Sequence, residues 1–156
     1  MATVASEIVD LFLTRVNDYR LTTIYQTSGS TSLTTYIEPW LIDSIVEFDI
    51  CTQDLTYTAT SGSVEGSFTQ DLNIETKSIL SQIMVKYWMA KAVQDILQMN
   101  NFVQDHDYKT MSVSQNLTAK MNYYNTKKEE ISQILENYGF KYLDWSRWRN
   151  QLFYTP

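Results

Sequence analysis

The stretch that decides the fold is residues 79–89, which read Ile79-Leu80-Ser81-Gln82-Ile83-Met84-Val85-Lys86-Tyr87-Trp88-Met89. Its apolar residues recur at steps of three and four, the period of one face of an α-helix. The pattern predicts a helix over about residues 74–99, with Asn73 as its N-cap and Asn100-Asn101 as its stop. The apolar face is wider than one stripe, so this helix is expected to pack against more than one partner.

Upstream of this stretch, the sequence predicts two further helices. Apolar residues at helical spacing predict the first over about residues 3–20. Residues 22–35 are dense in Ser and Thr, whose hydroxyls compete for backbone hydrogen bonds, and a loop is predicted there. A shorter helix is predicted over about 36–48, with Pro39 tolerated in its first turn. Its expected buried face consists of Ile37, Leu41, Ile45 and Phe48.

A β-hairpin is predicted at about residues 54–69. Apolar residues and Thr alternate from Leu55 to Thr60, and the turn residues Ser61-Gly62-Ser63 follow. Because a two-stranded hairpin is marginally stable alone, it must lean on the helices or pair with a neighbouring chain.

Downstream, a long helix and an aromatic tail are predicted. Ser112 and Gln115 form a candidate capping box for a helix that reaches about Tyr138, and Gly139 suits the residue that closes it. The expected fold is mainly α, a bundle of about four helices with a hairpin insertion and an extended C-terminal tail. The chain divides into a body, residues 1–139, and a docking tail, residues 140–156.

The tail is the predicted partner-binding site. A short tail cannot leave six aromatic rings in water without becoming sticky, and Trp, Tyr and Arg are enriched where proteins bind each other tightly. Docking on a partner is favoured, and folding back onto the body stays open as the alternative. The candidate binding residues are Phe140, Tyr142, Trp145, Arg147, Trp148, Arg149, Phe153 and Tyr154.

Charge is spread unevenly over the chain. Residues 1–108 hold 5 Lys and Arg against 14 Asp and Glu, and residues 109–156 hold 7 against 4, so −9 and +3 sum to the net charge of −6. An acidic body repels a phosphate backbone, which argues against a dedicated nucleic-acid binder. No apolar run approaches the roughly 20 residues of a membrane span, and the N-terminus does not resemble a signal peptide, so a soluble protein is expected.

The residues that could carry chemistry do not form a catalytic or metal-binding pattern. His106, the single histidine, lies between Asp105 and Asp107, where a solvated turn is expected. Asp43 and Glu47 share a helical face that is expected to meet solvent. Cys51 is expected to be a buried, inert thiol. The sequence therefore predicts no enzyme, no cofactor and no metal site.

The order of elements resembles the head-to-tail connector, or adaptor, proteins of tailed bacteriophages. Residues 79–89, Asp105-His106-Asp107-Tyr108-Lys109-Thr110-Met111-Ser112 and Gln115-Asn116-Leu117 carry the likeness, because they are similar to a helix, a short D-x-(F/Y)-K turn and a second helix in phage neck components. The likeness covers about residues 70–138 in pattern and the remainder in layout.

The resemblance implies a structural virion protein of the neck, assembled in the host cytoplasm. It implies a ring, usually dodecameric, beneath the portal protein and in contact with other neck or tail proteins, through which DNA passes without specific binding. The tail, residues 140–156, would reach the portal. Two other classes stay open: a small helical protein-binding or regulatory module whose tail packs on its own core, and an enzyme of unrecognised type.

Overall fold

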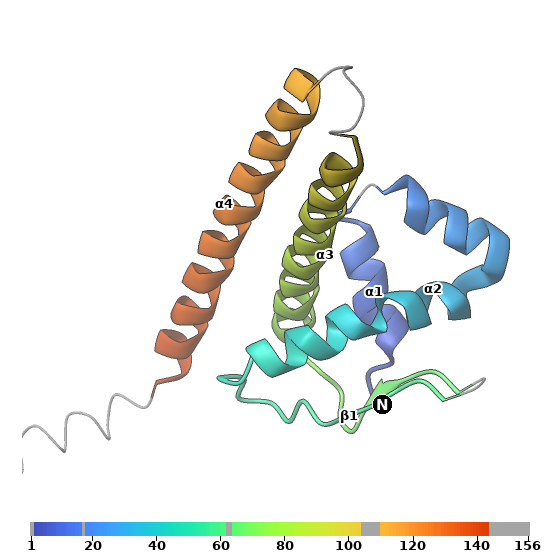
Figure 1. Cartoon of the computed structure of the whole chain (residues 1–156). Helices are drawn as coiled ribbons and strands as arrows, with labels where there is room; N and C mark the ends of the chain where they lie inside the picture. Colours follow the sequence, from blue (N-terminus) through green and yellow to red (C-terminus); the bar gives the residue numbers. More distant parts are fainter. Residues whose placement is uncertain (1, 17, 62–63, 104–109, 144–156) are drawn as a thin grey trace, which may run out of the picture.

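The structure is a computed structural model that describes residues 2–16, 18–61, 64–103 and 110–143. It is mainly helical with a small antiparallel hairpin, as the sequence predicts (Figure 1). No helix in these ranges is both long enough and apolar enough to cross a membrane. In chain order the elements are α1 (Ala5–Leu13), α2 (Tyr19–Glu47), β1 (Tyr57–Thr58), β2 (Ser67–Phe68), α3 (Ile74–Val103) and α4 (Thr110–Tyr142).

Helix α3 is the central element and packs against α1, α2 and α4. Its wide apolar face makes this possible, because Leu80, Ile83 and Met84 are fully buried. Asn73 is the predicted N-cap, and its side-chain oxygen accepts a 2.7 Å hydrogen bond from the amide of Thr76. The predicted stop at residues 100–101 is wrong, because α3 continues to Val103. Asn lowers helix propensity only modestly and does not end a helix by itself.

Helix α1 is shorter than the predicted helix over residues 3–20. Residues before Ala5 are extended instead, and they pair with β2: the amide of Phe68 donates to the carbonyl of Thr3 over 2.9 Å. At the other end, Asp18 starts a new helix by accepting a 2.8 Å hydrogen bond from the amide of Arg20. Long-range pairing at one end and a local cap at the other therefore decide its length.

Helix α2 overturns the predicted loop over residues 22–35. The hydroxyls of Thr22 and Thr23 donate to the carbonyls four residues earlier, at 3.2 and 2.9 Å, so they bond within the helix and do not compete with it. The interruption lies only at Gly29, whose φ of 80° and ψ of 178° kink the helix. Pro39 lies in the helix interior, not in the first turn as predicted. The predicted buried face is confirmed, with Ile37, Leu41 and Phe48 fully buried and Ile45 partly buried.

The hairpin is confirmed but its strands are shorter than the predicted span of 54–69. Tyr57 lies opposite Phe68 and Thr58 opposite Ser67. The extended N-terminal residues run along the other side of β2, where the amide of Ala5 donates to the carbonyl of Gly66 over 2.8 Å. Phe68 is almost fully buried. The hairpin is thus part of the body of its own chain.

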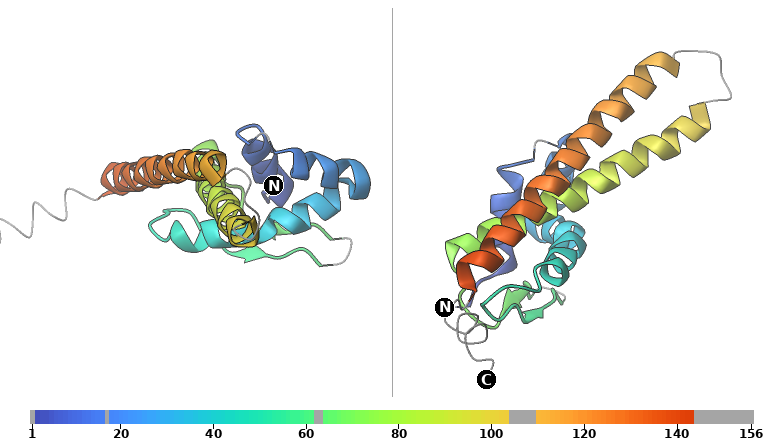
Figure 2. Two further views of the ribbon diagram at one scale, coloured as in Figure 1. Left: turned by 45° about the horizontal axis from the view of Figure 1, so that its top comes forward. Right: turned by 90° about the vertical axis from the view of Figure 1, so that its left-hand side faces the viewer.

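Helix α4 begins before the predicted capping box and ends after the predicted stop. Ser112 and Gln115 lie inside it, and it passes through Gly139 to Tyr142. Glycine in a helix interior costs only about 0.5–1 kcal/mol, which packing can offset. The division at residue 139 therefore falls inside a helix. In Figure 2 the end of α3 and the start of α4 extend beyond the other helices; we refer to this projecting part as the arm.

Candidate protein-binding surface

The structure describes two of the eight predicted binding residues, Phe140 and Tyr142, both in the last turn of α4. The other six lie outside the described residues: Trp145, Arg147, Trp148, Arg149, Phe153 and Tyr154. His106, Asp105 and Asp107 also lie outside them. The predicted docking role of the tail therefore stays a prediction.

Tyr142 is held by its own chain, whereas Phe140 is not. The hydroxyl of Tyr142 donates a 3.0 Å hydrogen bond to Glu75 at the start of α3, and Lys141 reaches both oxygens of the same carboxylate at 2.8 Å. Hydrogen bonds from Lys141 and Tyr142 lower the pKa of Glu75 below its usual value. The side chain of Phe140 is 59% exposed, so its ring is available to a partner.

Tyr138 fixes the end of α4 against the segment after α2. Its hydroxyl lies 2.9 Å from the hydroxyl of Thr52 and accepts a hydrogen bond from the Thr52 amide. Its ring contacts Phe48 edge-on, with centroids 4.9 Å apart. Cys51 is half-buried, with its sulfur between the hydroxyls of Tyr138 and Thr76. The ends of α2 and α4 are thus held together.

Next to this junction, α2 presents an apolar surface that the sequence analysis missed. Ile42 and Val46 in α2, and Ile50 just after the helix ends at Glu47, are 41%, 73% and 44% exposed, and we call these three residues the α2 stripe. Ile42 and Val46 lie away from the buried face of the same helix. Asp43 and Asp49 beside them are also exposed, so the stripe has an acidic border. The spacing was visible in the sequence, but nothing local tells which apolar face is left uncovered.

The carboxylates of Asp43 and Glu47 do not share one environment, although both were expected to face solvent. Asp43 is exposed, but Glu47 is partly buried and forms an ion pair with Lys86 of α3. Burial first, and then a hydrogen bond to Glu47, raise the pKa of Tyr87 to about 12. Glu47 therefore joins α2 to α3 instead of belonging to an exposed carboxylate pair.

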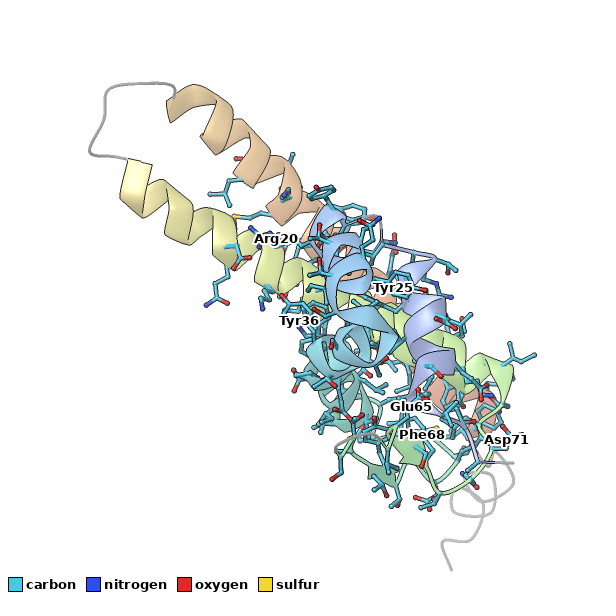
Figure 3. The ribbon with its side chains drawn as sticks, turned by 90° about the vertical axis from the view of Figure 1, so that its right-hand side faces the viewer. Arg20, Tyr25, Tyr36, Glu65, Phe68 and Asp71 are labelled. Atoms are coloured by element: carbon cyan, nitrogen blue, oxygen red, sulfur yellow. The ribbon has the colours of Figure 1, made fainter. Side chains whose placement is uncertain are left out.

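A groove lies where the arm leaves the body, between α2, α3 and α4, with a volume of about 480 Å³. Figure 3 shows Arg20 and Tyr36, two of its lining residues, on α2. Its lining includes tyrosine and tryptophan side chains, and it carries two exposed lysines, Lys91 and Lys120. The residues that matter for its chemistry are Asp18, Arg20, Tyr36, Trp40, Trp88, Lys91, Asp95, Lys120 and Tyr123.

Most polar groups in the groove bind one another. Arg20 pairs with Asp95 at 2.7 Å, and the indole N–H of Trp88 donates to Asp18 over 2.8 Å. Lys91 donates to the Tyr36 hydroxyl over 3.2 Å, with its ammonium 5.0 Å from the centre of that ring. These bonds shape the walls and place no nucleophile beside a base. An open groove of this kind is suited to binding a side chain or a helix.

Within the described residues, no group of three or more His, Cys, Asp or Glu side chains is arranged to hold a metal ion. In the same part of the chain, every buried side-chain nitrogen or oxygen has a hydrogen-bond partner. Comparisons of the chain with protein-family profiles, with curated proteins and with solved structures found no match.

Proposed function

We propose that this protein is a structural component of a tailed-phage virion, a head-to-tail adaptor that forms a ring below the portal around the DNA channel. The proposal starts from the resemblance of residues 79–89, 105–112 and 115–117 to phage neck components. The helical fold with a hairpin between the second and third helices is consistent with that layout.

The main observation in support of the proposal is an exposed apolar surface on a body whose buried polar groups are hydrogen-bonded. The α2 stripe and Phe140 are exposed, while the buried polar side chains of the described residues are all hydrogen-bonded. Exposed apolar residues that lie together on a surface are expected where a protein associates with another. A subunit that works by fitting against neighbours needs such surfaces and needs no catalytic group.

Charge supports the same proposal. The acidic excess of residues 1–108 disfavours tight contact with phosphates, and a channel wall that lets DNA pass requires weak contact. In this proposal the tail, with Trp145 and Trp148 as anchors and Arg147 and Arg149 at its rim, binds the portal protein.

The alternative is a small helical binding or regulatory module whose tail packs on its own body. The groove at the base of the arm supports this alternative, because a groove can bind a peptide or a helix of a partner protein. Native mass separates the two proposals. We expect the purified chain to form a ring alone, or on mixing with the portal protein encoded in the same genome. A chain that remains monomeric at high concentration and does not bind that portal would contradict the adaptor proposal.

A further inference from the structure

We propose that the α2 stripe of one copy of this chain docks into the groove at the base of the arm of a second copy. The inference rests on the proposed ring and names the contact that builds it. Both surfaces are exposed in the part of the chain that the structure describes, and they lie on different sides of α2.

The shapes of the two surfaces match a known mode of association, in which a helix lays an apolar face into a groove. The stripe offers Ile42 and Val46, one helical turn apart on α2, and Ile50 just after the helix end, and Val46 is the most exposed of the three. The groove offers aromatic walls, including Tyr36, Trp40 and Tyr123, the last of which is 52% exposed. Its volume of about 480 Å³ is in the range of clefts that bind ligands.

The charges identify a second copy as the occupant. The stripe is bordered by the exposed carboxylates of Asp43 and Asp49, whereas the groove carries the exposed ammonium groups of Lys91 and Lys120. Of the other charged groups that line the groove, Arg20 and Asp95 form an ion pair, and the carboxylate of Asp18 is bonded to the indole of Trp88, so the five charged groups together leave a net charge of +1. One chain therefore carries both halves of a complementary contact.

The same charges decide the symmetry of the contact. Two stripes placed face to face would bring four carboxylates together, which is unfavourable. The docking of one copy's stripe into another copy's groove is a head-to-tail contact. A repeated head-to-tail contact closes into a ring when the rotation between neighbouring subunits permits. A C2 dimer through the stripe is thus disfavoured.

The test uses two variants of the full chain that each destroy one half of the contact. Val46→Asp places a charge at the centre of the stripe, and the double variant Lys91→Glu with Lys120→Glu reverses the groove. We expect each to weaken self-association about tenfold or more, measured by sedimentation, because apolar contacts at an interface centre dominate affinity. Val64→Asp, an exposed residue on the hairpin, is the matched control and should assemble like the wild type.

Mixing the two variants tests the direction of the contact. The Val46→Asp chain keeps an intact groove and the Lys91→Glu/Lys120→Glu chain keeps an intact stripe, so together they should form a 1:1 complex and nothing larger. Adding Asp43→Lys and Asp49→Lys to the groove variant should restore assembly within one chain, because the charges are exchanged. Circular dichroism confirms that each variant is folded.

Several outcomes would overturn the inference. If Val46→Asp assembles with wild-type affinity, the stripe is not part of the interface. If the mixture of the Val46→Asp and Lys91→Glu/Lys120→Glu chains stays monomeric, the groove is not the surface that the stripe binds. A wild-type chain that never self-associates would also refute the contact. If a ring forms and binds the portal while these variants behave like wild type, only this contact is wrong. If no ring forms and no portal binds, the adaptor proposal itself fails.

Discussion

The hydroxyl of Tyr57 in β1 donates a 2.7 Å hydrogen bond to the carboxylate of Glu38 inside α2. The same carboxylate oxygen accepts a 2.7 Å hydrogen bond from the amide of Thr60. Glu38 is buried. This one oxygen therefore ties the hairpin to the helix beside it, and it explains how a hairpin with two-residue strands is held in place.

Replacing Glu38 by Gln should reduce the dependence of stability on acid pH. Burial alone would raise the pKa of Glu38, but the hydrogen bonds from Thr60 and Tyr57 bring it below the usual 4.5. A carboxyl whose pKa is lowered on folding stabilises the fold when the pH is above the pKa of the unfolded state. This stabilisation is lost as the pH falls from about 4.5 through the pKa of the folded state. Urea unfolding of both proteins from neutral to acidic pH measures the change.

The matched control for this prediction is Glu129→Gln, an exposed carboxylate on α4. It should leave the acid dependence as it is in the wild type. An unchanged acid dependence in Glu38→Gln would show that the hairpin is not held by the ionised carboxylate.

Three Gly→Ala variants should change the stability of the fold in different directions. A Cβ at Gly66 would collide with the Tyr57 hydroxyl, so Gly66→Ala should cost about 1–3 kcal/mol. Gly29→Ala should also destabilise by about 1–3 kcal/mol, because φ at that position is 80°. Gly139→Ala should stabilise by about 0.5–1 kcal/mol, because a Cβ there would meet only Ile50 at 3.6 Å within a helix. Thermal melts of the three variants are the measurement, and a destabilised Gly139→Ala would contradict a helix that runs through that residue.

Among the carboxylates near the groove, Asp18 should be the one whose removal destabilises the fold most, because it makes two different contacts. One oxygen caps α2 through the amide of Arg20, and the other accepts from the indole of Trp88, each at 2.8 Å. We expect Asp18→Ala to lower the free energy of unfolding by about 1–2 kcal/mol and to change the fluorescence of Trp88. Asp10→Ala, at an exposed position of α1, serves as the control and should have little effect. Equal melts for the two variants would contradict this prediction.

The tail prediction is tested by Trp145→Ala combined with Trp148→Ala. Each large aromatic anchor at an interface centre contributes about 2–4 kcal/mol, so the double variant should lose binding to the portal protein while the body keeps its melting temperature. Tyr25→Ala, an exposed aromatic residue on α2, is the control and should retain binding. A sharp fall in the melting temperature, with binding lost only in proportion to unfolding, would show instead that the tail packs on its own body.

The parts of the fold that follow from local patterns were predictable from the sequence. The period of residues 79–89 requires a helix, and the side-chain oxygen of Asn73 caps it as predicted. The alternation around Ser61 produces a hairpin in which Ser61 and Val64 bridge the turn. In each case the signal lies within a few residues, because helix and strand periods are properties of neighbouring side chains.

The errors lie where distant residues compete with local preference. The Thr-rich segment of α2 is helical because its hydroxyls bond backwards and because Leu21 and Leu33 find buried positions against the body. Helix α4 continues past Gly139 because Lys141 and Tyr142 bind Glu75, which lies at the start of α3. Differences in helix propensity of under about 1 kcal/mol per residue are too small to outweigh such contacts.

The sequence by itself determined the helical class, the hairpin and the aromatic, basic character of the last residues. Only the tertiary structure decided which apolar face stays uncovered. Ile42 and Leu41 are neighbours of equal hydrophobicity, yet Leu41 is buried against the body and Ile42 belongs to the exposed stripe. Likewise, Lys91 and Lys120 share one groove although they are far apart in the chain. The physical reason is that burial depends on how α2, α3 and α4 pack together, and no local pattern records that packing.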